Sequence, residues 1–133
     1  MSGPLNILIL DDNRDMLHFL QVCLTKKGFR TTAVPNVPEA LEAISKEKFD
    51  VFIVDVRLKQ FSGISFLKSI RNRGDVSPVI MMSGFADRKE VQECLNLGAY
   101  DFLFKPFHLE VVIDLLQNID KRNQRFEKMG VVI

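Results

Sequence analysis

Hydrophobic residues along the chain follow two alternating patterns. Short runs rich in apolar residues are separated by longer stretches in which apolar residues recur every three or four positions. The short runs cover residues 5–10, 29–34, 51–54, 79–82 and 100–104. Three of them are nearly continuous in apolar residues, which is typical of strands covered on both faces. The pattern predicts five strands.

The stretches between these runs predict five amphipathic helices. Their apolar stripes begin at Met16, Ala40, Ile64, Val91 and Leu109. Gly28 is placed to cap the end of the first helix. Asn36 is placed to cap the start of the second, with Pro38 in its first turn.

Strands and helices that alternate in this way predict an α/β fold with a parallel sheet and helices on both faces. The short connections favour a doubly wound, flavodoxin-like (βα)5 arrangement with strand order 2-1-3-4-5. We expect one domain over residues 1–120, followed by a C-terminal helix extension or linker over residues 121–133. In such sheets a site lies beyond the carboxyl ends of the strands, near the switch between strands 1 and 3.

Composition and charge narrow the class of protein. The chain has 133 residues, 47% of them hydrophobic, which suits one globular domain. Its formal charge of +1 gives no overall electrostatic field that would attract nucleic acid or anionic lipid. No apolar run reaches the length of a membrane span, and the start lacks a signal-peptide pattern. Cys23 and Cys94 are expected to be small buried hydrophobes rather than a disulfide or metal pair. We expect a cytoplasmic protein that binds neither membrane nor nucleic acid directly.

Polar residues follow four of the predicted strands. Asp11 and Asp12 follow the first strand, Asp55 the third, Ser83 the fourth and Lys105 the fifth. Each alone suits a helix cap, a turn or a solvated side chain. Together at one sheet edge, three carboxylates need a cation such as Mg²⁺, and the lysine and hydroxyl suit a phosphoryl group. The set therefore favours phosphoryl transfer, for which an aspartate can be the nucleophile.

The same motifs carry a resemblance to a known family. They are Ile9-Leu10-Asp11-Asp12-Asn13, the stretch from Ile53 to Leu58, Ser83-Gly84, Gly98-Ala99-Tyr100-Asp101-Phe102 and Lys105-Pro106-Phe107. In this order and spacing, from about Leu5 to Leu116, the chain resembles the receiver domain of two-component response regulators. The resemblance implies signal transduction through a phosphorelay, with a histidine kinase or phosphotransfer protein as the partner.

The resemblance also implies roles for individual residues. Asp55 would accept the phosphoryl group, and the chain would catalyse only its own phosphorylation and dephosphorylation. Mg²⁺ or Mn²⁺ would be held by Asp12, Asp55 and the main-chain oxygen of Arg57, with Asp11 acting through water. Lys105 would hold the phosphoryl group ahead of a cis peptide bond to Pro106.

Switching would depend on two further positions. Ser83 would move onto the phosphoryl group, and Phe102 would turn inward with it. This movement would reshape the surface formed by the fourth helix, the fifth strand and the fifth helix. A homodimer could form through this surface. Arg57 and Phe85 lie two residues after Asp55 and Ser83, where they would flank the phosphoryl group. We expect Phe85 to restrict the attacking water and to lengthen the phosphoryl lifetime.

Three other functions fit the chain less well. A phosphatase of the haloacid dehalogenase type needs an acid where Arg57 stands, and a cap region. A nucleotide or flavin binder needs a glycine-rich or hydroxyl-rich loop after the first strand, where residues 11–15 are largely acidic. A scaffold that is never phosphorylated would not need the complete set of site residues.

Two features stay open at this level. Ile119, Asn123 and Phe126 continue the spacing of the last helix. They fit either a solvated helix end or a signalling helix that leads to an output domain or a dimer partner. His18 and His108 have no partner histidine, so neither is expected to bind a metal or to act in acid–base chemistry.

Overall fold

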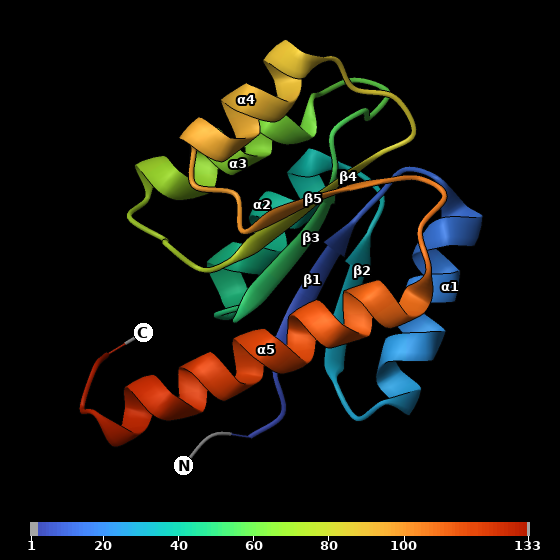
Figure 1. The fold of residues 1–133 in the computed structure, drawn as a ribbon. Helices are drawn as coiled ribbons and strands as arrows, with labels where there is room; N and C mark the ends of the chain where they lie inside the picture. The colour runs from blue at the N-terminus through green and yellow to red at the C-terminus, as the bar shows by residue number, and fades with distance from the viewer. Residues whose placement is uncertain (1–2, 133) are drawn as a thin grey trace.

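Strands and helices alternate along the whole chain in the computed structural model, which describes residues 3–132 (Figure 1). The strands are β1 (Asn6–Leu10), β2 (Arg30–Val34), β3 (Val51–Asp55), β4 (Val79–Ser83) and β5 (Asp101–Phe104). The helices are α1 (Arg14–Lys26), α2 (Val37–Lys46), α3 (Gly63–Asn72), α4 (Arg88–Asn96) and α5 (Leu109–Lys128). Each strand predicted from the apolar runs is present, with ends that differ by no more than one residue.

The five strands form one parallel sheet in the order β2-β1-β3-β4-β5. The predicted doubly wound fold and its strand order are therefore confirmed. β1 lies between β2 and β3, so the chain leaves β1 in one direction across the sheet and later returns in the other. The register pairs Leu10 with Val54, which brings the carboxyl ends of β1 and β3 to the same level.

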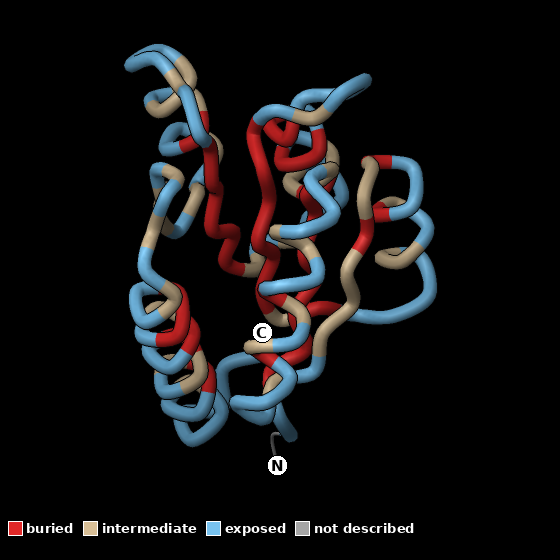
Figure 2. The backbone as a smooth tube through the Cα atoms, turned by 90° about the vertical axis from the view of Figure 1, so that its right-hand side faces the viewer, coloured by how far each residue is buried: buried red, intermediate tan, exposed pale blue. Residues whose placement is uncertain are grey.

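Helices cover both faces of the sheet (Figure 1). On one face, Ile7 and Ile9 of β1 pack in a cluster with buried residues of α1 and α5. On the other, Leu8 and Leu10 belong to a cluster with buried residues of α2, α3 and α4. This alternation explains the continuous apolar runs, because successive side chains of a central strand point to opposite layers. Figure 2 shows the buried strands between helices whose outer surfaces are exposed.

Several helix ends follow the expected capping chemistry. The Asn36 side chain accepts a hydrogen bond from the Glu39 amide at the start of α2, with Pro38 in the first turn. Gly28 follows α1 with φ of +94°, a left-handed conformation that glycine adopts at little cost. Both predictions are confirmed.

α5 extends well beyond the stripe that first indicated it. It continues to Lys128, and both Ile119 and Asn123 are buried. After the helix, Gly130 has φ of +77° and the Val131 amide donates to the Phe126 carbonyl. α5 is continuous across position 120, and the division of the chain there stays a prediction. Within residues 3–132, no helix is both long enough and apolar enough to cross a bilayer.

One arginine ties α3 to the segments around it. The Nε and Nη2 atoms of Arg71 donate to the main-chain oxygens of Leu97 and Gly98, between α4 and β5. Its Nη1 atom donates to the oxygens of Asp75 and Ser77, between α3 and β4. Arg71 therefore fixes how the end of α4 meets the sheet.

Candidate functional site

Three carboxylates lie together at the carboxyl edge of the sheet. Asp11 and Asp12 directly follow β1, and Asp55 ends β3. One carboxylate oxygen from each lies within 4.8 Å of the others, as the matched ends of the adjacent strands β1 and β3 require. Asp11 is fully buried and Asp55 is 6% exposed, whereas Asp12 is half-buried. The sequence prediction that these three acids meet is confirmed.

Lys105 reaches this cluster from the end of β5. Its ammonium donates to Asp11 Oδ2 and to Asp55 Oδ2, both at 2.9 Å. Burial alone would lower the pKa of Lys105, but the hydrogen bonds that it donates to Asp55 and Asp11 outweigh this effect and hold the pKa above its usual value. The lysine is therefore a fixed positive charge between two acids. The Lys105–Pro106 peptide bond is cis.

The charges in the cluster do not cancel. Three carboxylates and one ammonium leave a formal charge of −2. Burial raises the pKa of Asp11, against the opposing hydrogen bonds from the Asn13 amide and Lys105. A hard divalent cation would remove this repulsion, and clustered carboxylate oxygens are the donors that it prefers. The residues present therefore fit Mg²⁺ or Mn²⁺.

Main-chain amides hold all three carboxylates in place, beginning with the Asn13 amide, which donates to Asp11 Oδ1 at 2.9 Å. The Arg57 amide donates to Asp55 Oδ1 at 3.0 Å, and the Lys59 amide donates to Asp12 Oδ2 at 2.9 Å. Gly63 closes this loop against β3, and a Cβ atom there would lie 2.0 Å from the main-chain oxygen of Asp55. Only glycine fits so close to the backbone. The sequence shows this glycine just before the third apolar stripe. Its close approach to the Asp55 main chain becomes evident only in the folded loop.

Ser83 lies at the end of β4 with its hydroxyl turned into its own loop. The Oγ atom donates to the main-chain oxygen of Phe85 and accepts from the Phe85 amide. The serine is fully buried, whereas Phe85 is 71% exposed. Phe102, the other predicted switch residue, is half-buried, with its ring 5.1 Å from that of Phe104.

Arg57 points from the loop after β3 toward the loop after β4. Its Nε atom donates to the Phe85 oxygen at 3.0 Å, and its Nη2 atom lies 2.6 Å from Glu90 Oε1. Its guanidinium lies 5.5 Å from the centre of the Phe85 ring. The sequence predicts Arg57 and Phe85 at the site but gives no sign of Glu90. No local pattern pairs residues 33 positions apart.

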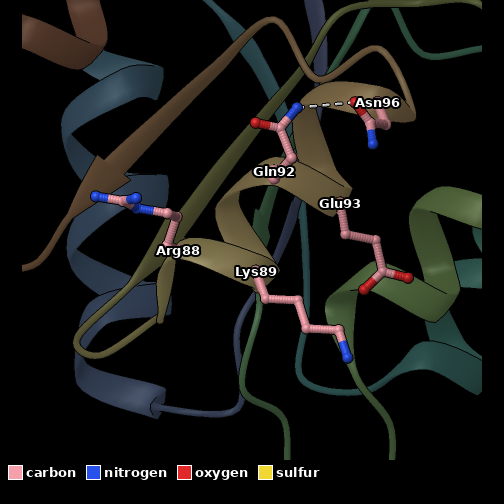
Figure 3. Close-up of a pocket in the computed structure, with 5 residues that line it drawn as sticks. All are labelled: Arg88, Lys89, Gln92, Glu93 and Asn96. Atoms are coloured by element: carbon pink, nitrogen blue, oxygen red, sulfur yellow. Dashed lines mark hydrogen bonds between the residues drawn. The ribbon is translucent and has the colours of Figure 1, made fainter.

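Two surface hollows are alternatives to the acid cluster as candidate sites. One of about 300 Å³ adjoins it and is lined in part by Asp12, Lys59 and Phe61. A larger one of about 630 Å³ lies along α4 (Figure 3). Its lining residues all come from that one helix: Arg88, Lys89, Gln92, Glu93 and Asn96. Side chains along a single helix do not converge on a ligand, so the carboxylate cluster remains the candidate site.

Comparison with known proteins agrees with this geometry. Residues 7–117 match the response regulator receiver domain family, and the chain belongs to that family. It is 34% identical over 110 residues to the regulatory protein AtoC of Escherichia coli, covering 83% of this chain and 24% of AtoC. It is 34% identical over 125 residues to the response regulator PilR of Pseudomonas aeruginosa, covering 93% of this chain and 28% of PilR. The chain thus spans about a quarter of the length of these relatives.

Solved structures show the same fold. The receiver domain of the Francisella response regulator 1452 matches with a TM-score of 0.83 at 29% identity, covering 90% of this chain and 98% of that one. A two-component response regulator from Clostridium difficile matches with a TM-score of 0.84 at 29% identity, covering 89% and 97%. These matches favour the receiver function over the phosphatase and nucleotide-binding alternatives.

Proposed function

We propose that Asp55 accepts a phosphoryl group from a phosphohistidine of a histidine kinase or phosphotransfer protein, in a Mg²⁺-dependent reaction. An Asp55 carboxylate oxygen forms the new bond to phosphorus while the bond from phosphorus to the donor imidazole breaks. The observation that best supports this proposal is the position of Asp55, which contacts Lys105 and also lies within the acid cluster. The chain would catalyse only this transfer and its own dephosphorylation. A cytoplasmic location is part of the proposal.

The metal assignment follows from the donors present. Asp12, Asp55 and the main-chain oxygen of Arg57 would hold Mg²⁺ directly, with Asp11 acting through water. The bound cation would neutralise charge that develops on the phosphoryl oxygens. Lys105 would hold a phosphoryl oxygen with an ammonium that is already fixed beside Asp55. Mn²⁺ has the same preference for oxygen ligands and would serve as well.

The switch would begin at Ser83. Its hydroxyl has one proton to donate, which goes to the Phe85 oxygen in this structure, so it must turn to reach a phosphoryl group on Asp55. Phe102 would turn inward as Ser83 moves, and the surface of α4, β5 and α5 would change. We propose that a homodimer can form through this surface. Exposed apolar side chains are available on all three elements: Leu95, Phe104 and Val111.

Arg57 and Phe85 would set the lifetime of the phosphoryl group. Arg57 contacts the Phe85 ring and main-chain oxygen in the loop after β4, and we propose that the two side chains flank a phosphoryl group on Asp55. Replacing Phe85 with alanine should speed the loss of label from Asp55. An unchanged or slower loss would contradict this role.

Phosphorylation itself can be tested with acetyl phosphate and Mg²⁺, followed by intact mass measurement. We expect the added mass of one phosphoryl group, lost when Mg²⁺ is removed and lost in Asp55→Asn. Asp15→Asn is a matched control because Asp15 is an exposed acid in the first turn of α1; it should be labelled like the wild type. Labelling that persists in Asp55→Asn would disprove the assignment.

A further inference from the structure

The main-chain oxygen of Phe85 joins the site to α4. It accepts hydrogen bonds from the Ser83 hydroxyl and from Arg57 Nε. The same guanidinium reaches Glu90 Oε1 through Nη2 at 2.6 Å. One arginine therefore connects the loop after β3, the loop after β4 and the first turn of α4. We refer to the ion pair as the Arg57–Glu90 bridge.

Glu90 is held in place independently of Arg57. It forms a capping box with Asp87: the Asp87 side chain accepts from the Glu90 amide at 2.8 Å, and Glu90 Oε1 accepts from the Asp87 amide at 3.3 Å. The Glu90 side chain is 24% exposed, compared with 53% for Arg57. An acceptor fixed by a helix cap determines where the longer and more mobile arginine points.

The Arg57–Glu90 bridge affects the orientation of the Ser83 hydroxyl through the Phe85 oxygen. A hydroxyl has one proton to donate, and that of Ser83 goes to the Phe85 oxygen rather than toward Asp55. Arg57 Nε donates to that same oxygen at 3.0 Å. While Glu90 holds Arg57, the acceptor that keeps Ser83 turned away therefore stays in position.

We propose that Glu90 is a positioning residue that stabilises the unphosphorylated orientation of Ser83 through Arg57 and the Phe85 oxygen. The inference rests on the proposed phosphorylation of Asp55. A phosphoryl group there offers new acceptors to both Arg57 and Ser83, so it competes with the bridge. Release of Glu90 removes a constraint on the first turn of α4, which couples the charge on Asp55 to that helix.

The test compares Glu90→Gln with Glu93→Gln. Glutamine keeps the reach needed for the capping box but loses the charge that pairs with Arg57. Glu93 is a matched control because it is an acid of the same helix that forms an ion pair of its own, with Lys68 of α3 at 2.9 Å, with side chains 41% and 53% exposed. Among residues 3–132, that pair makes no hydrogen bond or ion pair with Ser83 or Phe85. Both variants should fold, which thermal melting verifies.

The first measurement is the affinity for beryllofluoride, a phosphoryl mimic, by calorimetry at saturating Mg²⁺. Glu90→Gln should bind it about two- to five-fold more tightly than the wild type, the range expected for a partly exposed ion pair. Glu93→Gln should bind it as the wild type does. Equal or weaker binding by Glu90→Gln would overturn the proposal.

The second measurement needs no ligand. The Phe85 amide donates to Ser83 Oγ at 3.1 Å, so its hydrogen exchange reports how firmly the loop is held. Exchange at Phe85 should be faster in Glu90→Gln and unchanged in Glu93→Gln; equal exchange in Glu90→Gln would refute the bridge. Failure of the wild type to bind beryllofluoride would instead count against phosphorylation of Asp55, and the exchange result would still decide the role of Glu90.

Discussion

Lys105 competes with any metal for the charge of the acid cluster. Its ammonium contacts Asp11 and Asp55 directly, and no cation can approach these acids without being repelled by it. Replacing Lys105 with methionine should therefore tighten Mg²⁺ binding by at least about five-fold, because even two unit charges about 4 Å apart repel by roughly 1 kcal/mol in water and Mg²⁺ carries two. The same change should slow labelling by acetyl phosphate at least about ten-fold, because a phosphoryl oxygen loses its partner.

Calorimetric titration with Mg²⁺ checks the first effect, and mass spectrometry over time checks the second. Lys89→Met is the control, since Lys89 is exposed on α4. Weaker Mg²⁺ binding in Lys105→Met would show that the ammonium supports the metal site instead of opposing it.

The two cysteines should differ sharply in reactivity. Burial raises the pKa of the Cys94 thiol from 9.0 to about 11, which lowers its reactive thiolate fraction at pH 8 by about a hundred-fold. Cys23 is only partly buried. Iodoacetamide at pH 8 should label Cys23 first in the native protein and Cys94 only after denaturation. Peptide mass mapping checks this, and early labelling of Cys94 would contradict the burial.

At the level of elements, Arg71 cross-links α3 to the segment that follows α4 and to the loop before β4. Its four hydrogen bonds to main-chain oxygens are lost when the side chain is removed, three of them in part-buried positions. We expect Arg71→Ala to lower the free energy of unfolding by about 2–4 kcal/mol. Arg73→Ala, at the exposed end of the same helix, should cost less than about 0.5 kcal/mol. Urea unfolding measures both, and equal effects would refute the cross-link.

The elements themselves were predictable because their signals are local. Continuous apolar runs at β1, β3 and β4 reflect burial on both faces, and Asn36 and Gly28 mark helix ends through their own backbone preferences. The length of α5 was less evident. Its last turns are largely polar in sequence, and the burial of Asn123 depends on packing that no local pattern encodes.

The residues that make up the site were predictable from the sequence, but their detailed contacts were not. Parallel strands deliver Asp11, Asp55 and Lys105 to one edge, so their meeting followed from strand order alone. The direction of the Ser83 hydroxyl and the pairing of Arg57 with Glu90 depend on side-chain rotation and on two loops packed together. Those contacts required the three-dimensional structure.

At the level of the molecule, the proposed dimer surface can be tested by introducing a charged side chain into it. Val111 on α5 is 40% exposed, and Val22 on α1 is 37% exposed, so lysine at either position should be tolerated by the fold. With Mg²⁺ and beryllofluoride, sedimentation should show wild-type dimers. Val111→Lys should weaken them at least about ten-fold by placing charge in a desolvated contact. Val22→Lys should leave them unchanged. A wild-type protein that stays monomeric would contradict the proposed dimer.

The distribution of the acid cluster and its lysine along the chain has a practical consequence. Asp11 and Lys105 are in contact although 94 positions separate them in sequence, and Asp55 comes from a strand between them. A proteolytic fragment that lacks β1, β3 or β5 cannot assemble these charges. Uptake of a phosphoryl mimic would therefore count intact, correctly folded molecules, and so could serve as a quality assay for preparations and variant libraries of this protein.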